Sequence, residues 1–194
     1  MNMKGYRMIG IIAVMLTVLL MVMGCAGKSG YMVTATPAAG PAPDKALVYF
    51  MRPSGMGFAV HFQIWDSDHF IGLSQAKSYF AYECNPGTHL FIGIAENKVA
   101  IQADLKAGQS YYVGTNVRTG WAKARMQFTP VTRGSELWDK MEAYKQSLNC
   151  LAAKEEERAK WEAAKKQEVL PLVDYFTNGE GTARVLKLSK EDGR

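Results

Sequence analysis

The chain contains 194 residues, of which 48% are hydrophobic and 21% are charged. This composition excludes a disordered or low-complexity protein, and the length is that of one domain with short appendages. The formal net charge is +5, but the basic residues are spread along the chain. Because no stretch has enough clustered Lys and Arg to bind the phosphates of a nucleic acid, we expect no nucleic-acid partner.

The N-terminus has the pattern of a secretory signal peptide. Lys4 and Arg7 precede an uncharged run over residues 8–23 that is rich in Ile, Leu, Val and Met. A charged end followed by a short apolar centre is typical of an export signal that is removed from the mature protein. We therefore predict a signal peptide over residues 1–24.

The apolar run ends in Val-Met-Gly-Cys at residues 22–25. This ending resembles the bacterial lipoprotein signal, in which the cysteine is acylated on sulfur and becomes the new N-terminus. The resemblance implies a lipid on Cys25 and a membrane as partner, and Ala26 favours the periplasmic face of the outer membrane. The alternative is a retained membrane anchor, because residues 8–27 are uncharged and about twenty residues span a bilayer.

The next segment has the composition of a tether. Residues 26–43 are mostly small and include Pro37, Pro41 and Pro43. Proline hinders regular strand pairing and favours an extended, solvated chain. At ~3.3 Å per residue, this segment reaches roughly 50–60 Å. We therefore expect Cys25 and residues 26–43 to hold a folded domain away from the lipid headgroups.

From residue 44 the pattern changes to short apolar and aromatic runs separated by turns. Alternating β-branched and aromatic residues indicate strands, and Asn85-Pro86-Gly87 and Thr119-Gly120 are typical hairpin turns. Eight strands without room for crossover helices predict a mainly β fold, an antiparallel β-sandwich or small barrel over residues 44–133. The predicted strands are residues 46–52, 59–65, 70–73, 78–84, 88–95, 98–105, 110–117 and 121–128.

Several motifs of this region together resemble a known family. They are Leu-Val-Tyr-Phe-Met-Arg-Pro at residues 47–53, Ile-Gly-Leu at 71–73, Ser-Tyr-Phe at 78–80, Pro-Gly-Thr-His at 86–89 and Ala-Gly-Gln-Ser-Tyr-Tyr-Val at 107–113. The set resembles a family of bacterial envelope lipoproteins defined only as a domain of unknown function. It is also similar to the surface-layer β-domains named for a Pro-Glu-Gly-Ala motif. The resemblance implies the fold and a cell-envelope location, and it brings no catalytic residue.

A long C-terminal α-helix is predicted after the β region. Ser135 is a suitable N-cap for it. Residues 154–168 continue the helix as a charged, solvated segment, and Pro171 is expected to end it. We thus predict a helix over residues 134–170, followed by a tail over residues 171–194.

One face of this helix carries an apolar stripe. The stripe either docks on the sandwich or forms a surface for self-association or for an envelope protein partner. Two heptads are too few for an independent coiled coil, so association would have to recruit the sheet or Trp161. The stripe residues are Leu137, Met141, Tyr144, Leu148 and Leu151.

Cys84 and Cys150 remain once Cys25 is lipidated. An oxidising envelope permits a disulfide between them, which would pin the helix to the sheet by closing a loop of about sixty-six residues. The alternative is that Cys84 is a buried thiol in a strand.

The three histidines, His61, His69 and His89, lie in or beside predicted strands. A pair of them with Asp66 or Asp68 would suit a divalent ion, but strand histidines that face solvent are commoner. We therefore predict no metal site and no cofactor. The chain has no Gly-x-Ser-x-Gly element, and no catalytic residue is assigned.

Aromatic residues of the strands offer a recognition surface, although most of them are expected to lie in the core. They are Tyr49, Tyr79, Tyr82, Tyr111, Tyr112 and Trp121.

These features predict an exported, lipid-anchored envelope protein with a non-enzymatic binding or structural role. One alternative is a carrier that holds a small apolar ligand or lipid in a cavity inside the β-domain. A second alternative is an envelope hydrolase. It requires a cleft in which a histidine meets a serine or a carboxylate within hydrogen-bond distance.

Overall fold

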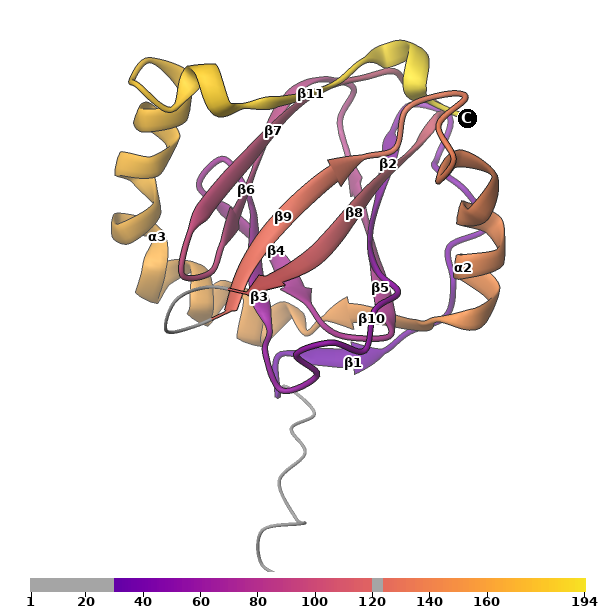
Figure 1. Ribbon diagram of the computed structural model, residues 1–194, viewed down its shortest axis with the longest axis horizontal. Helices are drawn as coiled ribbons and strands as arrows, with labels where there is room; N and C mark the ends of the chain where they lie inside the picture. The colour runs from indigo at the N-terminus through magenta and orange to yellow at the C-terminus, as the bar shows by residue number, and fades with distance from the viewer. Residues whose placement is uncertain (1–29, 120–123) are drawn as a thin grey trace, which may run out of the picture.

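The computed structural model describes residues 30–119 and 124–194, which form two β-sheets with helices at the periphery (Figure 1). Sheet A contains, in spatial order, β1 (Met32–Thr34), β10 (Asn149–Ala153), β5 (Ser78–Cys84), β2 (Ala46–Arg52), β8 (Ser110–Thr119) and β9 (Ala124–Pro130). Sheet B contains β11 (Leu186–Leu188), β7 (Lys98–Leu105), β6 (Gly87–Ile94), β3 (Phe62–Asp66) and β4 (His69–Ser74). The prediction of a mainly β, sandwich-like fold is confirmed, but the sheets do not close into a barrel.

Both sheets are mixed, so the prediction of purely antiparallel pairing is wrong. β2 pairs antiparallel with β5 but parallel with β8, while β10 and β11 lie parallel to β5 and β7. Hairpins do form at β3–β4, β6–β7 and β8–β9. The turn predicted at residues 85–87 instead carries the chain from β5 in sheet A to β6 in sheet B. The β2–β8 pair is parallel because the chain passes from β5 in sheet A to β6 and β7 in sheet B before it returns to sheet A beside β2.

The space between the sheets is filled by aromatic rings. Phe50 in β2 lies 5.1 Å from Phe80 and 5.2 Å from Phe91, measured between ring centroids. All three side chains are at most 2% exposed. The sheets approach closely at Gly93, where a Cβ atom would lie only 2.6 Å from Met126 Sδ. Burial of these rings is the main source of stability for such a fold.

The predicted continuous helix over residues 134–170 is wrong. In its place lie a short 3₁₀ turn η1 (Trp138–Lys140), helix α2 (Met141–Ser147), strand β10 and helix α3 (Glu155–Thr177). Leu148 already has an extended backbone, with φ −96° and ψ 154°, and Leu151 lies in β10. The reason is tertiary, because β5 offers an edge whose backbone groups pair with residues 149–151 and this outweighs the local helical pattern.

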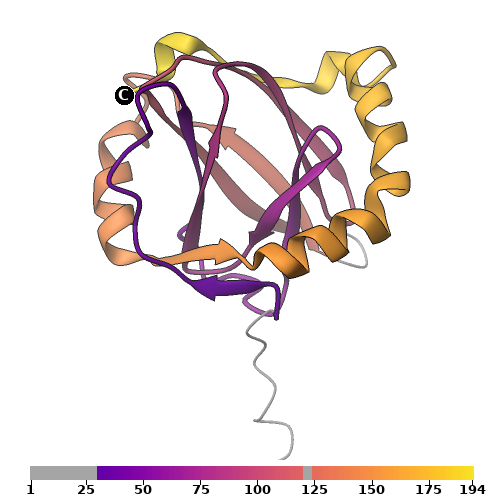
Figure 2. The same ribbon diagram turned by 180° about the vertical axis from the view of Figure 1, so that it is seen from behind.

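Helix α3 also continues through Pro171, which was predicted to end it. Proline cannot donate a hydrogen bond to the carbonyl four residues earlier, and α3 is bent along its length (Figure 2). The helix packs on sheet B, where Trp161 lies 5.6 Å from Phe70 between ring centroids. Val169 is 1% exposed in the main core. Phe176, on the other side of the proline, is 3% exposed in the same core, so packing on both sides of Pro171 maintains one helix.

Both ends of the described chain complete the sheets. β1, inside the predicted tether, pairs antiparallel with β10, and β11, inside the predicted tail, pairs parallel with β7. Two 3₁₀ turns, η2 (Thr182–Arg184) and η3 (Lys190–Asp192), flank β11. The prediction of a free tether over residues 26–43 is therefore wrong at Met32–Thr34. The predicted tail over residues 171–194 is likewise part of the fold, because β11 pairs with the edge of sheet B at β7.

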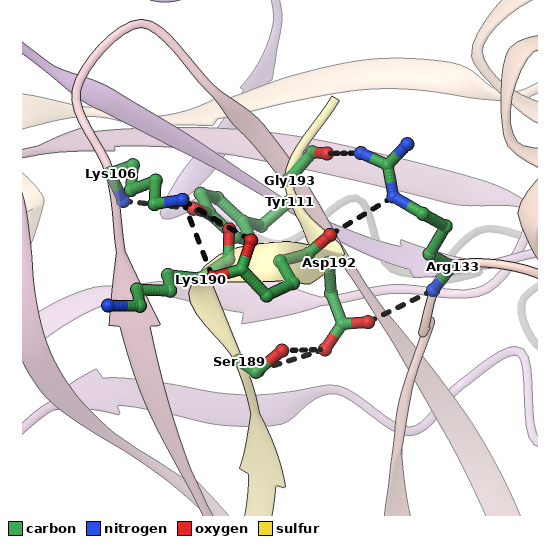
Figure 3. A network of polar contacts seen from close by, with 8 residues as sticks. Lys106, Tyr111, Arg133, Ser189, Lys190, Asp192 and Gly193 are labelled. Carbon is green, nitrogen blue, oxygen red and sulfur yellow. Dashed lines mark hydrogen bonds and ion pairs between the residues drawn. The ribbon is translucent and has the colours of Figure 1, made fainter.

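A polar network fixes the last residues of the chain (Figure 3). The backbone N–H of Arg133 donates to the Asp192 carboxylate at 3.0 Å. The Arg133 guanidinium donates to the carbonyl oxygens of Glu191 and Gly193 at 3.1 and 2.7 Å. Burial by itself would raise the pKa of Asp192, but the N–H donors of Arg133 and Ser189 outweigh burial and lower that pKa. The chain end is therefore held by specific contacts rather than left as a tail.

Candidate functional site

An open polar pocket lies where β5 ends and β6 begins, beside the β3–β4 turn. Its volume is about 400 Å³. Cys84 at this end of β5 lies opposite Ala46, whereas the far ends of the same two strands meet at Arg52 and Ser78, roughly 20 Å away. The pocket is lined by Lys45, Asp66, His69, Tyr82, Glu83, Cys84, Asn85 and His89.

An ion pair between Asp66 and His89 forms the floor of this pocket. His89 Nδ1 lies 2.7 Å from Asp66 Oδ2, and His89 Nε2 lies 2.9 Å from the Asn85 carbonyl oxygen. The hydrogen bond to Asp66, together with a side-chain interaction with Cys84, raises the pKa of His89 to about 10 against the opposing effect of burial. Both ring nitrogens therefore carry protons at neutral pH and donate to the two oxygens.

Tyr82 and Cys84 complete the cluster from β5. The Tyr82 hydroxyl donates to Asp66 Oδ2 at 3.1 Å, and burial and the Asp66 charge raise the pKa of Tyr82. Cys84 is 7% exposed, and its Sγ lies 3.8 Å from the Ala46 carbonyl oxygen. The two side chains share one face of the strand because they are two residues apart. Asp66 is thereby held by donors from two different sheets.

The cluster has the composition of a Cys-His-Asp triad but a different arrangement. In a triad the histidine Nε2 faces the nucleophile and accepts its proton. Here His89 Nε2 faces a backbone carbonyl, and an imidazolium has no free lone pair with which to accept a proton. The pocket therefore offers fixed charges and hydrogen-bonding groups, with Lys45 Nζ at the rim donating to Asn85 Oδ1 at 2.7 Å.

The other two histidines do not join the Asp66–His89 pair, although His69 lines the same pocket. His69 Nδ1 is 3.2 Å from Glu162 of α3, and Lys166 of α3 pairs with Asp68 at 2.6 Å. These contacts dock α3 on the β3–β4 turn, and the Lys166 hydrogen bond lowers the pKa of Asp68 despite burial. For His61, burial and the nearby Arg52 charge lower the pKa. Within residues 30–119 and 124–194, His, Cys, Asp and Glu side chains form no group of three that would hold a metal.

The predicted apolar stripe is divided among three places. Leu137, Met141, Tyr144 and Leu148 pack on the outer face of sheet A around Tyr49 and Tyr112, in a second small core. Leu151 packs against the main core from β10. Trp161 lies on sheet B, with its ring centroid 4.5 Å from that of Tyr31. The stripe is therefore not one association surface, and its first half docks on the sandwich.

The predicted disulfide is absent, because Cys84 and Cys150 are free thiols. Cys150 lies opposite Tyr79 near the start of β5, whereas Cys84 is the last residue of that strand. The strand itself thus holds the two thiols apart. Two other predictions, lipidation of Cys25 and a recognition role for Trp121, lie outside the described residues.

Most aromatic residues predicted for the strands lie in the interior, and only Tyr82 reaches the pocket. The buried ones, all at most 1% exposed, are Tyr49, Tyr79, Tyr111 and Tyr112. Sequence reasoning combined Asp66 with histidines only as a possible metal site, and it missed the Asp66–His89 ion pair with Tyr82. The available signal was alternation, because Phe80, Tyr82 and Cys84 share one face of β5 and His89 shares a face of β6 with Phe91.

The chain matches no protein-family model, no curated protein and no solved structure. The resemblance to envelope lipoproteins therefore stays a prediction. In the described part of the chain, no helix combines the length and apolar character needed to cross a membrane.

Proposed function

We propose that the chain is an exported, lipid-anchored protein of the bacterial cell envelope whose β-sandwich is a non-enzymatic binding module. The pocket around Asp66 and His89 is its ligand site. The observation that carries the binding role is the Asp66–His89 ion pair, which is oriented and largely desolvated beneath an open pocket, with side chains 9% and 16% exposed. Polar groups held in place before binding lose little entropy when a ligand arrives.

The chemistry of the rim favours a small polar ligand that carries both signs of charge. Lys45 and Glu83 supply one cation and one anion beside the Asp66–His89 pair. A uniformly charged ligand would be repelled by half of these groups, and an apolar ligand would leave them desolvated without partners. A zwitterion, or a pair of opposite charges on a partner protein, matches this rim.

The carrier alternative has less support from the interior of the domain. A ligand held between the sheets needs an enclosed apolar cavity of a few hundred Å³. Phe50, Phe80 and Phe91 occupy the centre of that space and contact one another. An apolar ligand would have to displace these rings.

Membrane anchoring is tested first by expressing the full chain in a bacterial host beside the Cys25→Ala variant. We expect the wild type to have the mass of a mature chain starting at Cys25 with its lipid, and to fractionate with membranes. The variant is expected to lack the lipid. Retention of residues 1–24 in both proteins, with equal membrane association, would contradict the lipoprotein proposal.

The ligand site is tested by calorimetric titration of the purified wild type with free amino acids and short peptides as zwitterionic probes. We expect binding that is lost in Lys45→Ala and Asp66→Asn. It should persist in Lys98→Ala, which changes an exposed lysine at the start of β7. Absence of binding by every zwitterionic probe would contradict the pocket proposal. A stoichiometric apolar molecule released on denaturation would favour the carrier instead.

A further inference from the structure

The loop between β2 and β3, residues 53–61, exposes two large apolar side chains. Met56 is 62% exposed and Phe58 is 69% exposed. The next most exposed large apolar residues in the described chain are Val33 and Leu170, each at 40%. Two large apolar side chains this exposed, separated only by Gly57, place apolar surface on one loop that a partner or a lipid surface would cover.

A buried arginine holds this loop in one conformation. The Arg52 guanidinium is 0% exposed and donates to the carbonyl oxygens of Met56 and Gly57, both at 2.8 Å, and of Val60 at 2.7 Å. It also lies 4.8 Å from the centroid of the Phe62 ring. Gly57 adopts φ +61°, which glycine tolerates without strain. Met56 and Phe58 are therefore presented by a fixed support, and little loop entropy is lost on contact.

The loop lies at the end of the molecule where the described chain begins. Gly30, the first described residue, lines one surface pocket together with His61 at the end of the loop. It lines a second surface pocket together with Ala76. The residue after Ala76, Lys77, comes within 3.3 Å of the Cβ position of Gly55 in the loop. Figure 1 shows the β2–β3 connection beside β1 at the lower end of the sandwich, where the coloured chain starts.

The length of chain between Gly30 and Cys25 limits how far this end can lie from a lipid on Cys25. Five residue steps separate the two positions, which span at most about 18 Å when fully extended. The tether is shorter than the predicted residues 26–43, because β1 at Met32–Thr34 already belongs to sheet A. Lys77 and Lys154 also lie at this end, beside the loop and beside Gly30, and lysines near a membrane surface are attracted to anionic headgroups.

We propose that the β2–β3 loop is a second membrane contact, which places Met56 and Phe58 in the headgroup region of the bilayer that holds the lipid on Cys25. Apolar side chains at such an interface are buried roughly 5–10 Å into the boundary with the acyl chains. The contact turns the Arg52 end of the sandwich toward the membrane and the Asp66–His89 pocket away from it. This inference rests on the proposed lipid anchor.

The test uses an environment-sensitive fluorophore attached to single cysteines of the full, lipidated chain in vesicles of phosphatidylethanolamine and phosphatidylglycerol. The reporter is Phe58→Cys and the matched control is Lys187→Cys in β11, both in a Cys84→Ala, Cys150→Ser background that removes the two free thiols. Lys187 is exposed, and β11 lies at the opposite end of the sandwich from β1 (Figure 1). We expect position 58 alone to shift to shorter emission wavelength and to become protected from aqueous iodide.

Each other outcome has a separate meaning. If mass spectrometry confirms the lipid on Cys25 but positions 58 and 187 behave alike, the loop proposal fails and the anchor stands. If Cys25 carries no lipid, the anchor proposal fails whatever the fluorophore reports. If position 58 is protected equally without vesicles and the protein is dimeric, a second copy covers the loop and the bilayer contact is contradicted.

Discussion

The two ends of the sandwich each bury a cationic side chain, and they compensate its charge differently. At the pocket end, the His89 imidazolium faces the Asp66 carboxylate at 2.7 Å. At the opposite end, Arg52 forms no ion pair with a carboxylate in the described chain and is held by carbonyl oxygens and the Phe62 ring. The charge of the His89 imidazolium depends on pH, whereas a backbone carbonyl does not titrate. The buried charge at one end therefore depends on pH, whereas at the other end it is fixed by hydrogen bonds to the backbone.

The largest effect is expected from Arg52→Ala. The substitution removes several hydrogen bonds together and leaves buried carbonyl oxygens unsatisfied, so the free energy of unfolding should fall by about 3–5 kcal/mol. Urea denaturation followed by circular dichroism measures the change. Arg52→Lys, which retains the charge but not the fork of donors, should lose less.

The matched control for Arg52 is Arg118→Ala, at an exposed position bonded to Gln127. It should change the free energy of unfolding by no more than about 0.5 kcal/mol. Equal losses at Arg52 and Arg118 would show that the hydrogen bonds from Arg52 to backbone carbonyl oxygens add no more to the free energy of unfolding than one exposed hydrogen bond.

The second effect is expected from Asp66→Asn, which keeps the shape of the side chain and removes its charge. Hydrogen bonds to charged groups contribute about 1.5–3 kcal/mol, and we expect a loss of that size in urea denaturation. Tyr82→Phe is the control, because it removes one donor from Asp66 and leaves the ion pair with His89 in place, so it should lose less than Asp66→Asn. If Tyr82→Phe is as damaging as Asp66→Asn, the ion pair is not the dominant contact.

The third effect is the pH dependence of stability at the pocket end. The pKa of His89 is raised from 6.5 to about 10 in the folded chain. Its stabilising contribution is therefore fully present below pH 6.5 and is lost as the pH rises toward 10. Burial lowers the pKa of Arg52 to about 10, so Arg52 stays protonated in both states between pH 6 and 9 and adds no slope there.

Free energies of unfolding measured from pH 6 to 9 check this difference. Wild type should lose stability with rising pH more steeply than His89→Asn. Parallel profiles for the two proteins would mean that His89 is not an imidazolium in the native state.

The smallest effect on stability is expected from Phe58→Ser. The side chain is 69% exposed, so its removal should change the free energy of unfolding by less than about 0.5 kcal/mol. The same substitution should weaken the membrane contact of the loop. A large loss of stability would show instead that Phe58 packs against the domain.

The strands with strong alternating or aromatic patterns were predictable from the sequence. β2, β5 and β7 have the predicted bounds, and the other five central strands differ by a few residues at their ends. The three missed strands, β1, β10 and β11, are short and lie beside another strand's edge. With three, five and three residues they are too short for a two-residue alternation to be recognised, and their pairing depends on strand edges that lie far away in the sequence.

In the candidate site, too, the local sequence pattern predicts the strands but not which of their side chains meet. Asp66, Tyr82 and His89 lie on three different strands, and each of them taken alone is an ordinary residue of a strand. They meet because β5 and β6 lie in different sheets and the β3–β4 turn closes over the end between them. The register of each strand decides which side chains point inward, and register depends on neighbouring strands.

The sequence by itself determined the class of fold, because two-residue alternation and turn residues are local properties of the chain. Its N-terminal pattern likewise predicts export and a lipid on Cys25 without reference to any fold. Only the tertiary structure decided that residues 149–153 form a strand, that the tether is shortened by β1, and that the pKa of His89 is raised to about 10. Each of these depends on a partner distant in the chain, whose hydrogen bonds or charge outweigh local preference.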